Sequence, residues 1–90
     1  MLRFSPRASA RMALLRAYSR GQGKLLKAIA KEGKVNEILS GSFISRYGLN
    51  AASSVKGALK RLVDDELIYR GSDGYIVYDR FMAEWLREME

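Results

Sequence analysis

The stretch SSVKGALKRLVDDELIYRGSDGYIVYD, residues 53–79, decides the fold of this chain. Its first half repeats apolar side chains at the spacing of one helical face, and these are Val55, Ala58, Leu59 and Leu62. Its second half reads as two short strands joined by RGSDG, in which Asp73-Gly74 is a favourable pair for a hairpin turn. The stretch therefore predicts a helix over about 51–65, followed directly by a β-hairpin.

The face of this helix opposite the apolar one is polar. It carries Ser53, Lys56, Gly57 and Lys60, with Arg61 at its edge. A face of this kind either contacts a polyanion or is simply the solvated side of a helix. The residues alone leave both interpretations open.

Two helices are expected before this one. The segment 21–34 predicts a helix that stops at Gly33, with an apolar stripe made of Leu25, Leu26 and Ile29. A short extended or irregular piece follows. The segment 40–49 then predicts a short helix capped by Ser40 or Ser42 and ended by Gly48, with inward side chains Phe43, Ile44 and Tyr47. Asn50 is a good N-cap for the next helix.

One more helix is expected after the hairpin. Asp79 can cap it, and its apolar side chains are Phe81, Met82, Trp85, Leu86 and Met89. The order is then three helices, a hairpin and a helix, with a tight turn between the second and third helices. A helix-turn-helix followed by a two-stranded wing is a winged helix. The sequence thus predicts a mainly α fold with a small β-hairpin, an α+β winged helix-turn-helix.

The first 20 residues are set apart by composition. We assign 1–20 to a basic N-terminal arm or helix and 21–90 to the winged-helix domain. The arm has no acidic residue, and 8–19 could form a helix. Three interpretations stand: an arm left from an upstream domain, an arm that contacts phosphates, or an Arg-rich and Ser-rich transit peptide.

The positive charge is unevenly placed. The 90 residues carry a formal net charge of +6. Residues 1–34 hold nine Lys and Arg against one acid, a net of +8, whereas residues 35–90 hold seven against nine acids, a net of −2. The basic excess suggests a polyanionic partner, but it lies outside the segment that has the DNA-binding pattern.

Composition excludes several classes of function. The chain has no cysteine and no histidine, which removes disulfides, zinc fingers and His-based acid–base catalysis. No apolar run reaches the length of a membrane span. We therefore expect no enzyme activity, no cofactor, no small-molecule substrate and no membrane partner.

Three segments together resemble the C-terminal winged-helix domain of prokaryotic AAA-type ATPases, often called archaeal ATPases. They are LLKAIAKEG at 25–33, FISRYGLNAASSVKGALKRLVDDELI at 43–68 and YIVYDRFMAEWL at 75–86. In that family the domain follows a nucleotide-binding core and its helical lid. The resemblance implies a cytoplasmic, prokaryotic protein linked to transcription regulation, with an ATPase domain or a second copy of the chain as partner.

The ATPase core itself is absent from this sequence. GQGK at 21–24 lacks the spacing of a P-loop and the Ser or Thr after its Lys. We expect either the C-terminal part of such an ATPase or a stand-alone relative of one.

The main functional hypothesis is binding of double-stranded DNA without catalysis. The helix over 51–65 would enter the major groove, and its expected contacts are Ser53, Ser54, Lys56, Gly57, Lys60 and Arg61. The wing and its flanks would add Arg70, Ser72, Gly74 and Arg46. The acids at 64–66 and at the wing tip would repel phosphates, so the alternative is a protein-docking or regulatory winged helix of an ATPase.

Overall fold

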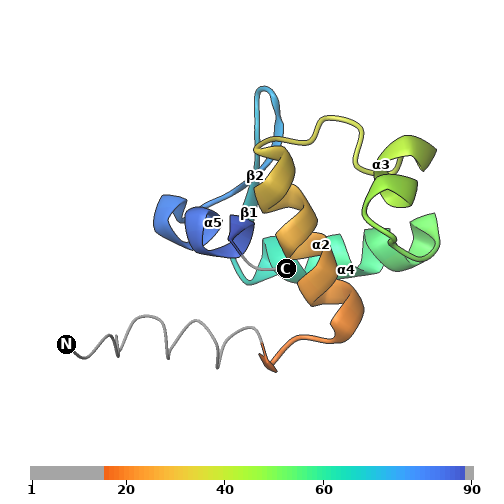
Figure 1. The fold of residues 1–90 in the computed structure, drawn as a ribbon, viewed down its shortest axis with the longest axis horizontal. Coiled ribbons are helices and arrows are strands. Elements are labelled where there is room, and N and C mark those ends of the chain that lie inside the picture. Colours follow the sequence, from red (N-terminus) through yellow and green to blue (C-terminus); the bar gives the residue numbers. More distant parts are fainter. Residues whose placement is uncertain (1–15, 89–90) are drawn as a thin grey trace.

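The computed structural model describes residues 16–88 (Figure 1). Its elements in chain order are α2 (Arg20–Glu32), α3 (Gly41–Arg46), α4 (Ala52–Asp64), β1 (Ile68–Gly71), β2 (Gly74–Val77) and α5 (Arg80–Arg87). The sheet is a two-stranded antiparallel hairpin. The predicted winged-helix architecture is confirmed, with three helices, a wing and a final helix.

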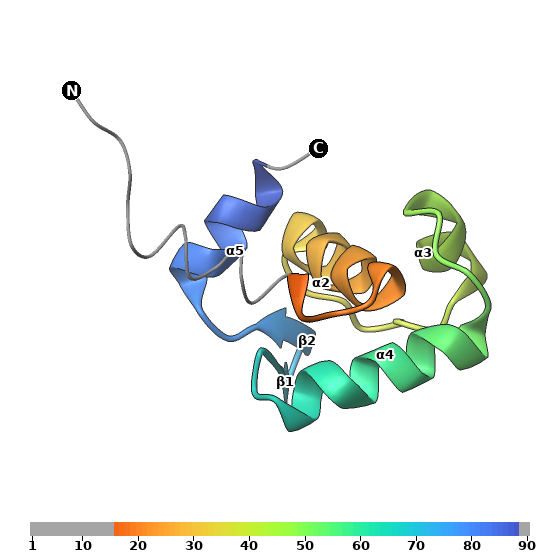
Figure 2. The same cartoon turned by 90° about the horizontal axis from the view of Figure 1, so that it is seen from below.

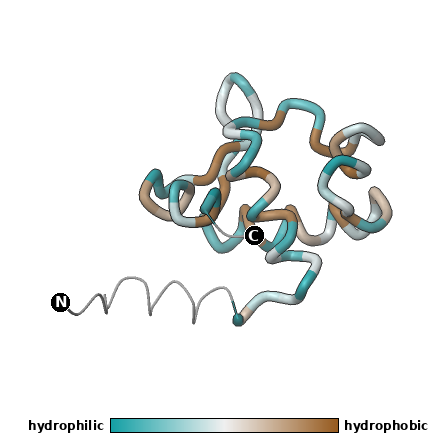
Figure 3. The backbone as a smooth tube through the Cα atoms, in the orientation of Figure 1, coloured by the Kyte–Doolittle hydropathy of each residue, from teal (hydrophilic) through white to brown (hydrophobic). Residues whose placement is uncertain are grey.

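Helix α2 lies at the centre of the fold. It packs against α4 on one side and α5 on another, and it also contacts β2 (Figure 2). The largest fully buried side chains come from α2, α4, β1 and α5, and they are Leu25, Leu26, Ile29, Leu62, Ile68 and Leu86. In Figure 3 the apolar stretches gather where the helices and the base of the hairpin meet. One hydrophobic core therefore holds all the elements together.

The chain enters the core earlier than the sequence indicated. Tyr18, assigned to the arm, is buried in the core cluster. Ser19 has extended backbone and forms a capping box with Gln22, so α2 begins at Arg20 and the expected helix over 8–19 does not reach its last residue. Gly33 ends α2 with φ of 89°, as predicted. The rest of the arm, 1–15, lies outside the described residues and stays a prediction.

The turn between α3 and α4 is tight, as expected. Ser40 caps α3, and Gly48 follows the helix with φ of 64°. The Gly48 N–H donates to the Ser45 carbonyl at 3.3 Å and the Leu49 N–H to the Ile44 carbonyl at 2.9 Å, which is a Schellman ending.

The predicted cap of α4 is wrong. The first helical bond runs from the Val55 N–H to the Ala51 carbonyl at 3.0 Å, so the N-cap is Ala51, one residue after Asn50. Because alanine has no side-chain acceptor, α4 starts without a side-chain cap.

The hairpin turn also differs from the expected one. Gly71 pairs with Gly74, so the two turn residues are Ser72 and Asp73 rather than Asp73-Gly74. Gly74 itself, with φ of 121°, lies under Val35, whose N–H and carbonyl both bond to Tyr75 at 3.0 and 2.8 Å. A Cβ at Gly74 would stand 2.4 Å from the Val35 carbonyl oxygen, and this approach requires glycine. The sequence treated 35–39 as extended or irregular and missed this pairing.

Helix α5 is capped by Asp79, as predicted, through its Oδ1 and the N–H groups of Phe81 and Met82. Met82 and Leu86 are buried against the core, whereas Phe81 is 61% exposed. The sequence suggests that Phe81 shares one apolar face with Met82 and Leu86, and this is wrong because Phe81 lies about 140° around the helix from Leu86. The Arg87 Nε donates to the Ala30 carbonyl at 2.8 Å and fastens α5 to α2.

Candidate nucleic-acid interface

The polar face of α4 is uncovered in the part of the chain that the structure describes. Val55 and Leu59 point into the core, while Ser53, Lys56 and Lys60 are exposed. In Figure 2, α4 runs along the edge of the domain, with α2 and α3 on its inner side and no described element on the other. No described element blocks this helix face, so it is open to a large partner. The major groove of DNA, for example, is wide enough to admit an α-helix.

The N-terminal half of α4 has a positive character. It has no side-chain cap and no acidic residue in its first turn, so the partial positive charge of the helix start is not compensated there. Ser53 and Ser54 add hydroxyl groups, and Lys56 forms no ion pair with any described residue. A Cβ at Gly57 would meet nothing within 4 Å, so this surface is open.

The C-terminal half of α4 is internally paired. Lys60 Nζ lies 2.9 Å from Asp64 Oδ2, and Arg61 Nε lies 2.9 Å from Asp65 Oδ2. The Tyr18 hydroxyl donates to the same Asp65 oxygen at 2.5 Å, and the Arg61 guanidinium carbon stands 4.7 Å from the centre of the Tyr18 ring. Arg61 therefore helps to hold Tyr18, near the start of the described chain, against the C-terminal end of α4.

These contacts shift the pKa values of the paired groups. The hydrogen bond from Tyr18, then that from Arg61, holds the pKa of Asp65 below its usual value. Burial, then the hydrogen bond to Asp65, raises the pKa of Tyr18. The hydrogen bond to Asp64 raises the pKa of Lys60. The pKa shifts of Asp65 and Lys60 favour their charged forms, and that of Tyr18 favours its neutral, hydrogen-bonded form.

Arg46 is also engaged within the domain. Its Nη1 lies 3.1 Å from both carboxylate oxygens of Glu32, and the Tyr47 hydroxyl donates to Glu32 Oε1 at 2.7 Å. The bond from Tyr47, followed by the charge of Arg46, lowers the pKa of Glu32. This cluster ties α3 to the end of α2, so Arg46 has a structural role whether or not it reaches a phosphate.

The wing offers fewer free groups than expected. Arg70 and Ser72 are exposed, with the Arg70 guanidinium carbon 5.6 Å from the Tyr75 ring centre. Gly74 is buried against Val35, which removes it from the exposed surface. Asp73 at the tip pairs with Lys34 at 3.2 Å, which neutralises part of the repulsion expected there.

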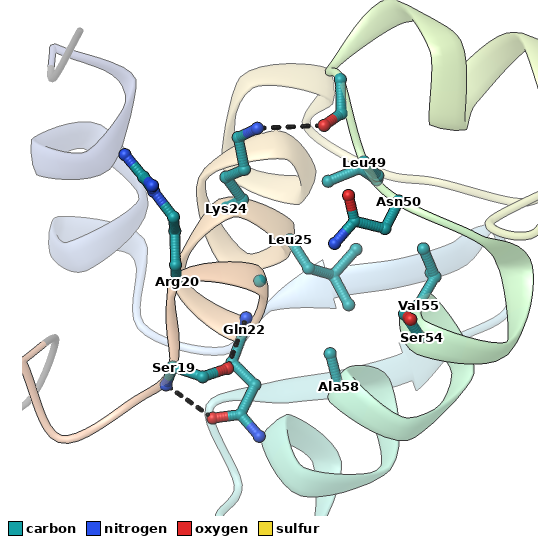
Figure 4. A pocket seen from close by; sticks show the side chains of 12 residues that line it. Ser19, Arg20, Gln22, Lys24, Leu25, Leu49, Asn50, Ser54, Val55 and Ala58 are labelled. Atoms are coloured by element: carbon teal, nitrogen blue, oxygen red, sulfur yellow. Dashed lines mark hydrogen bonds between the residues drawn. The ribbon is translucent and has the colours of Figure 1, made fainter.

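A pocket of about 700 Å³ lies beside the start of α4 (Figure 4). It forms between the N-terminal turns of α2, the turn at 48–50 and the first turns of α4. Leu25 and Val55 are among its apolar lining residues, Lys24 reaches across to the Gly48 carbonyl at 3.0 Å, and no lining residue is acidic. The sequence did not indicate it, because three separate segments build it.

Comparison with known families decides the classification. The sequence model of a family described as a probable winged helix domain matches residues 10–88. The chain belongs to this winged-helix family. No curated protein and no solved structure matched the chain. In this winged-helix domain, α3 and α4 are the helix-turn-helix and the β1–β2 hairpin is the wing. Within the described residues no helix has the length and apolar character needed to cross a membrane, and no acid cluster could hold a metal ion.

Proposed function

We propose that this winged-helix domain binds double-stranded DNA without catalysis, with the N-terminal half of α4 in the major groove. The observation that carries the proposal is the start of α4. It is uncovered, lacks both a cap and an acid, and presents Lys56 without an ion-pair partner among the described residues. Recognition helices of helix-turn-helix proteins contact base edges through this same end.

The exposed residues divide the contacts among them. Ser53 and Ser54 suit hydrogen bonds to phosphates or base edges, and Lys56 suits a guanine or a phosphate. Lys60 can exchange Asp64 for a phosphate, because an exposed pair of this kind is weak. Gly57 lets the DNA backbone come close to the helix.

The wing adds less to the interface. Arg70 and Ser72 can reach the minor groove or the DNA backbone, since both are exposed. Arg61 and Arg46 support the domain, and Gly74 shapes the wing from inside. Lys56, Lys60 and Arg70 are then the three cations that face the duplex. With three phosphate contacts, the slope of log affinity against log salt concentration is about −3. Three phosphate contacts give weak binding. Weak binding favours a domain that acts together with another module of the same assembly.

The resemblance to AAA-type ATPases points to that module. We infer that an ATPase domain, in a longer form of this protein or in a partner, brings the winged helix to DNA in a prokaryotic cytoplasm, where it acts in transcription regulation. A second copy of the chain is the other way to raise affinity, because two recognition helices one helical turn apart would read a bipartite site. Either arrangement raises the overall affinity for DNA above that of one winged helix with three phosphate contacts, because linked modules bind together.

Fluorescence anisotropy with a random-sequence duplex, titrated across salt, tests DNA binding. The full chain is compared with Lys56→Ala and with Arg80→Ala, a matched loss of one exposed positive charge on α5. We expect Lys56→Ala to weaken binding and to reduce the salt slope by about one, with little effect of Arg80→Ala.

A third variant separates the arm from α4. If Arg3→Gln/Arg7→Gln/Arg11→Gln alone abolishes binding and Lys56→Ala changes nothing, the attraction is a generic property of the basic arm. If the unaltered chain fails to bind at low salt, the DNA proposal is wrong and a protein-docking winged helix remains.

A further inference from the structure

The two faces of the hairpin differ in what covers them. Ile68 and Val77 are buried in the core. On the outer face Tyr69 is 44% exposed and Tyr78 is 72% exposed, and their ring centres are 5.8 Å apart in an edge-to-face arrangement. Ile76 pairs with Tyr69 across the strands and is only partly buried. We call the surface made by Tyr69, Ile76 and Tyr78 the tyrosine face.

The tyrosine face has the composition of an interaction surface. Tyrosine and isoleucine side chains on an open sheet face expose apolar area that a small domain usually buries. Neither tyrosine hydroxyl bonds to another described residue. Tyrosine combines large apolar area with a polar end and is enriched where proteins meet. An occupant is therefore expected to bring both apolar and polar groups.

The surroundings of this face are acidic. Residues 64–84 hold six acids against two arginines, and the three cations that pair with acids of this range, Lys34, Lys60 and Arg61, bring the net charge of the region to −1. Asp64, Asp65 and Asp73 are paired with cations, but Glu66 and Glu84 form no ion pair with a described residue. A nucleic-acid strand could stack on exposed tyrosines, but this negative charge disfavours it. The same charge favours a basic occupant.

The N-terminal segment of the chain has this chemistry. Residues 1–15, MLRFSPRASARMALL, contain three arginines and no acid, and six of their side chains are large and apolar. The segment joins the described domain close to the acidic region, because Tyr18 bonds to Asp65 at the end of α4. Only Glu66, Leu67 and Ile68 separate Asp65 from Tyr69. Fifteen residues span up to about 50 Å when extended, which is enough to reach the hairpin.

We propose that residues 1–15 dock on the tyrosine face of their own chain. Apolar side chains of the segment cover the two rings, and its arginines lie over the rings or beside the acids of the region. The segment thereby acts as an intramolecular cover for the wing base. The wing tip and the N-terminal half of α4 lie elsewhere on the domain, so this proposal does not depend on DNA binding.

Paramagnetic broadening in the full chain tests the docking. The protein has no cysteine, so Ser9→Cys gives one attachment site for a nitroxide label. The ring signals of selectively labelled tyrosines are then compared before and after reduction of the nitroxide. We expect strong loss of the Tyr69 and Tyr78 signals and full retention of the Tyr47 signal, since Tyr47 lies at the end of α3.

Two further samples keep the result decisive. In the charge-reversed chain Arg3→Glu/Arg7→Glu/Arg11→Glu, the loss of the Tyr69 and Tyr78 signals shrinks. In a mixture of isotope-labelled chain without nitroxide and unlabelled chain with nitroxide, both signals keep their intensity. Unbroadened Tyr69 and Tyr78 signals in the first sample, or equal broadening in the mixed sample, overturn the proposal; the second result would assign the face to the segment of another copy.

Discussion

The two halves of helix α4 have the same kinds of side chain but opposite availability. The N-terminal half begins without a cap, has no acid in its first turn and carries Lys56 without a described ion-pair partner. The C-terminal half has two cations, each paired with an acid four residues later, and one of these acids also binds Tyr18. A count of basic residues along the helix cannot separate the halves, but their partners do.

The difference assigns one half to the outside and the other to the domain itself. The C-terminal half anchors the entry of the chain, because Tyr18, Arg61 and Asp65 form one cluster. The N-terminal half contributes Val55 to the core and leaves its other side free. Substitutions in the cluster of Tyr18, Arg61 and Asp65 should therefore affect the stability of the domain. Substitutions on the exposed side of the N-terminal half of α4 should affect its affinity for DNA.

The largest effect is expected for Tyr18→Ala. It removes a buried ring from the core and the hydrogen-bond donor of Asp65, and it should lower the free energy of unfolding by about 3 kcal/mol. Thermal unfolding should shift down by roughly 15 °C. Tyr18→Phe keeps the ring and should cost only about 1 kcal/mol. Equal stability of Tyr18→Ala and the unaltered chain would show that this end of α4 is not an anchor.

The next largest effect is expected for Lys56→Glu, which places an acid in the acid-free half. The fold should be retained, since a carboxylate near a helix start is favourable. The salt slope for duplex binding should fall by about two, because one phosphate contact is lost and one repulsion is added. Anisotropy titrations at several salt concentrations measure it, with circular dichroism as the control for folding. An unchanged slope would move the DNA contact away from α4.

A smaller effect, of opposite sign in two assays, is expected for Gly57→Ala. The position is helical and open, with nothing within 4 Å of an added Cβ. The substitution should therefore stabilise the domain by about 1 kcal/mol while weakening DNA binding, because the methyl group holds the duplex away. Urea unfolding and anisotropy on the same samples test both signs. If affinity stays constant while stability rises, Gly57 is not at the interface.

Much of the fold could be predicted because its signals are local. The apolar faces of α2 and α4, the stop at Gly33, the turn at Gly48 and the cap at Asp79 all depend on neighbouring residues in the chain. Two of the features that the sequence missed depend on contacts between distant segments. Tyr18 meets Asp65 across 47 positions, and Val35 pairs with Tyr75 across 40.

The candidate site follows the same rule. Periodicity predicts that the polar face of α4 is exposed, and the structure confirms this for Ser53, Lys56 and Lys60. Periodicity does not show that Arg46 has an acidic partner, because Glu32 lies on another helix. The partner of Arg61 is local, since Asp65 follows it by four residues. Nor does periodicity show that Gly74 lies under a neighbouring backbone rather than at the wing surface. Exposure and pairs four residues apart can thus be predicted from a helical pattern, whereas contacts between separate elements depend on packing.

The smallest effect is expected in the pH dependence of the C-terminal half. The hydrogen bond from Tyr18, then that from Arg61, lowers the pKa of Asp65 in the folded chain, below the value of about 3.9 in an unfolded one. Its contribution to stability is therefore present above about pH 4 and is lost as the pH falls through the lower folded pKa. Burial and the bond to Asp65 raise the pKa of Tyr18, so its contribution is present below about pH 10 and is lost at higher pH.

Substitution of Asp65 tests the acidic limit of this window. The free energy of unfolding in urea should depend less on pH below about pH 4 in Asp65→Asn than in the unaltered chain. Tyr18→Phe should give an intermediate slope, because the Arg61 pair remains. The effect is small because the carboxylate is partly exposed and solvent screens it. Parallel profiles for Asp65→Asn and the unaltered chain would mean that Asp65 has the same pKa folded and unfolded. The C-terminal half of α4 would then be anchored by the buried ring of Tyr18 alone.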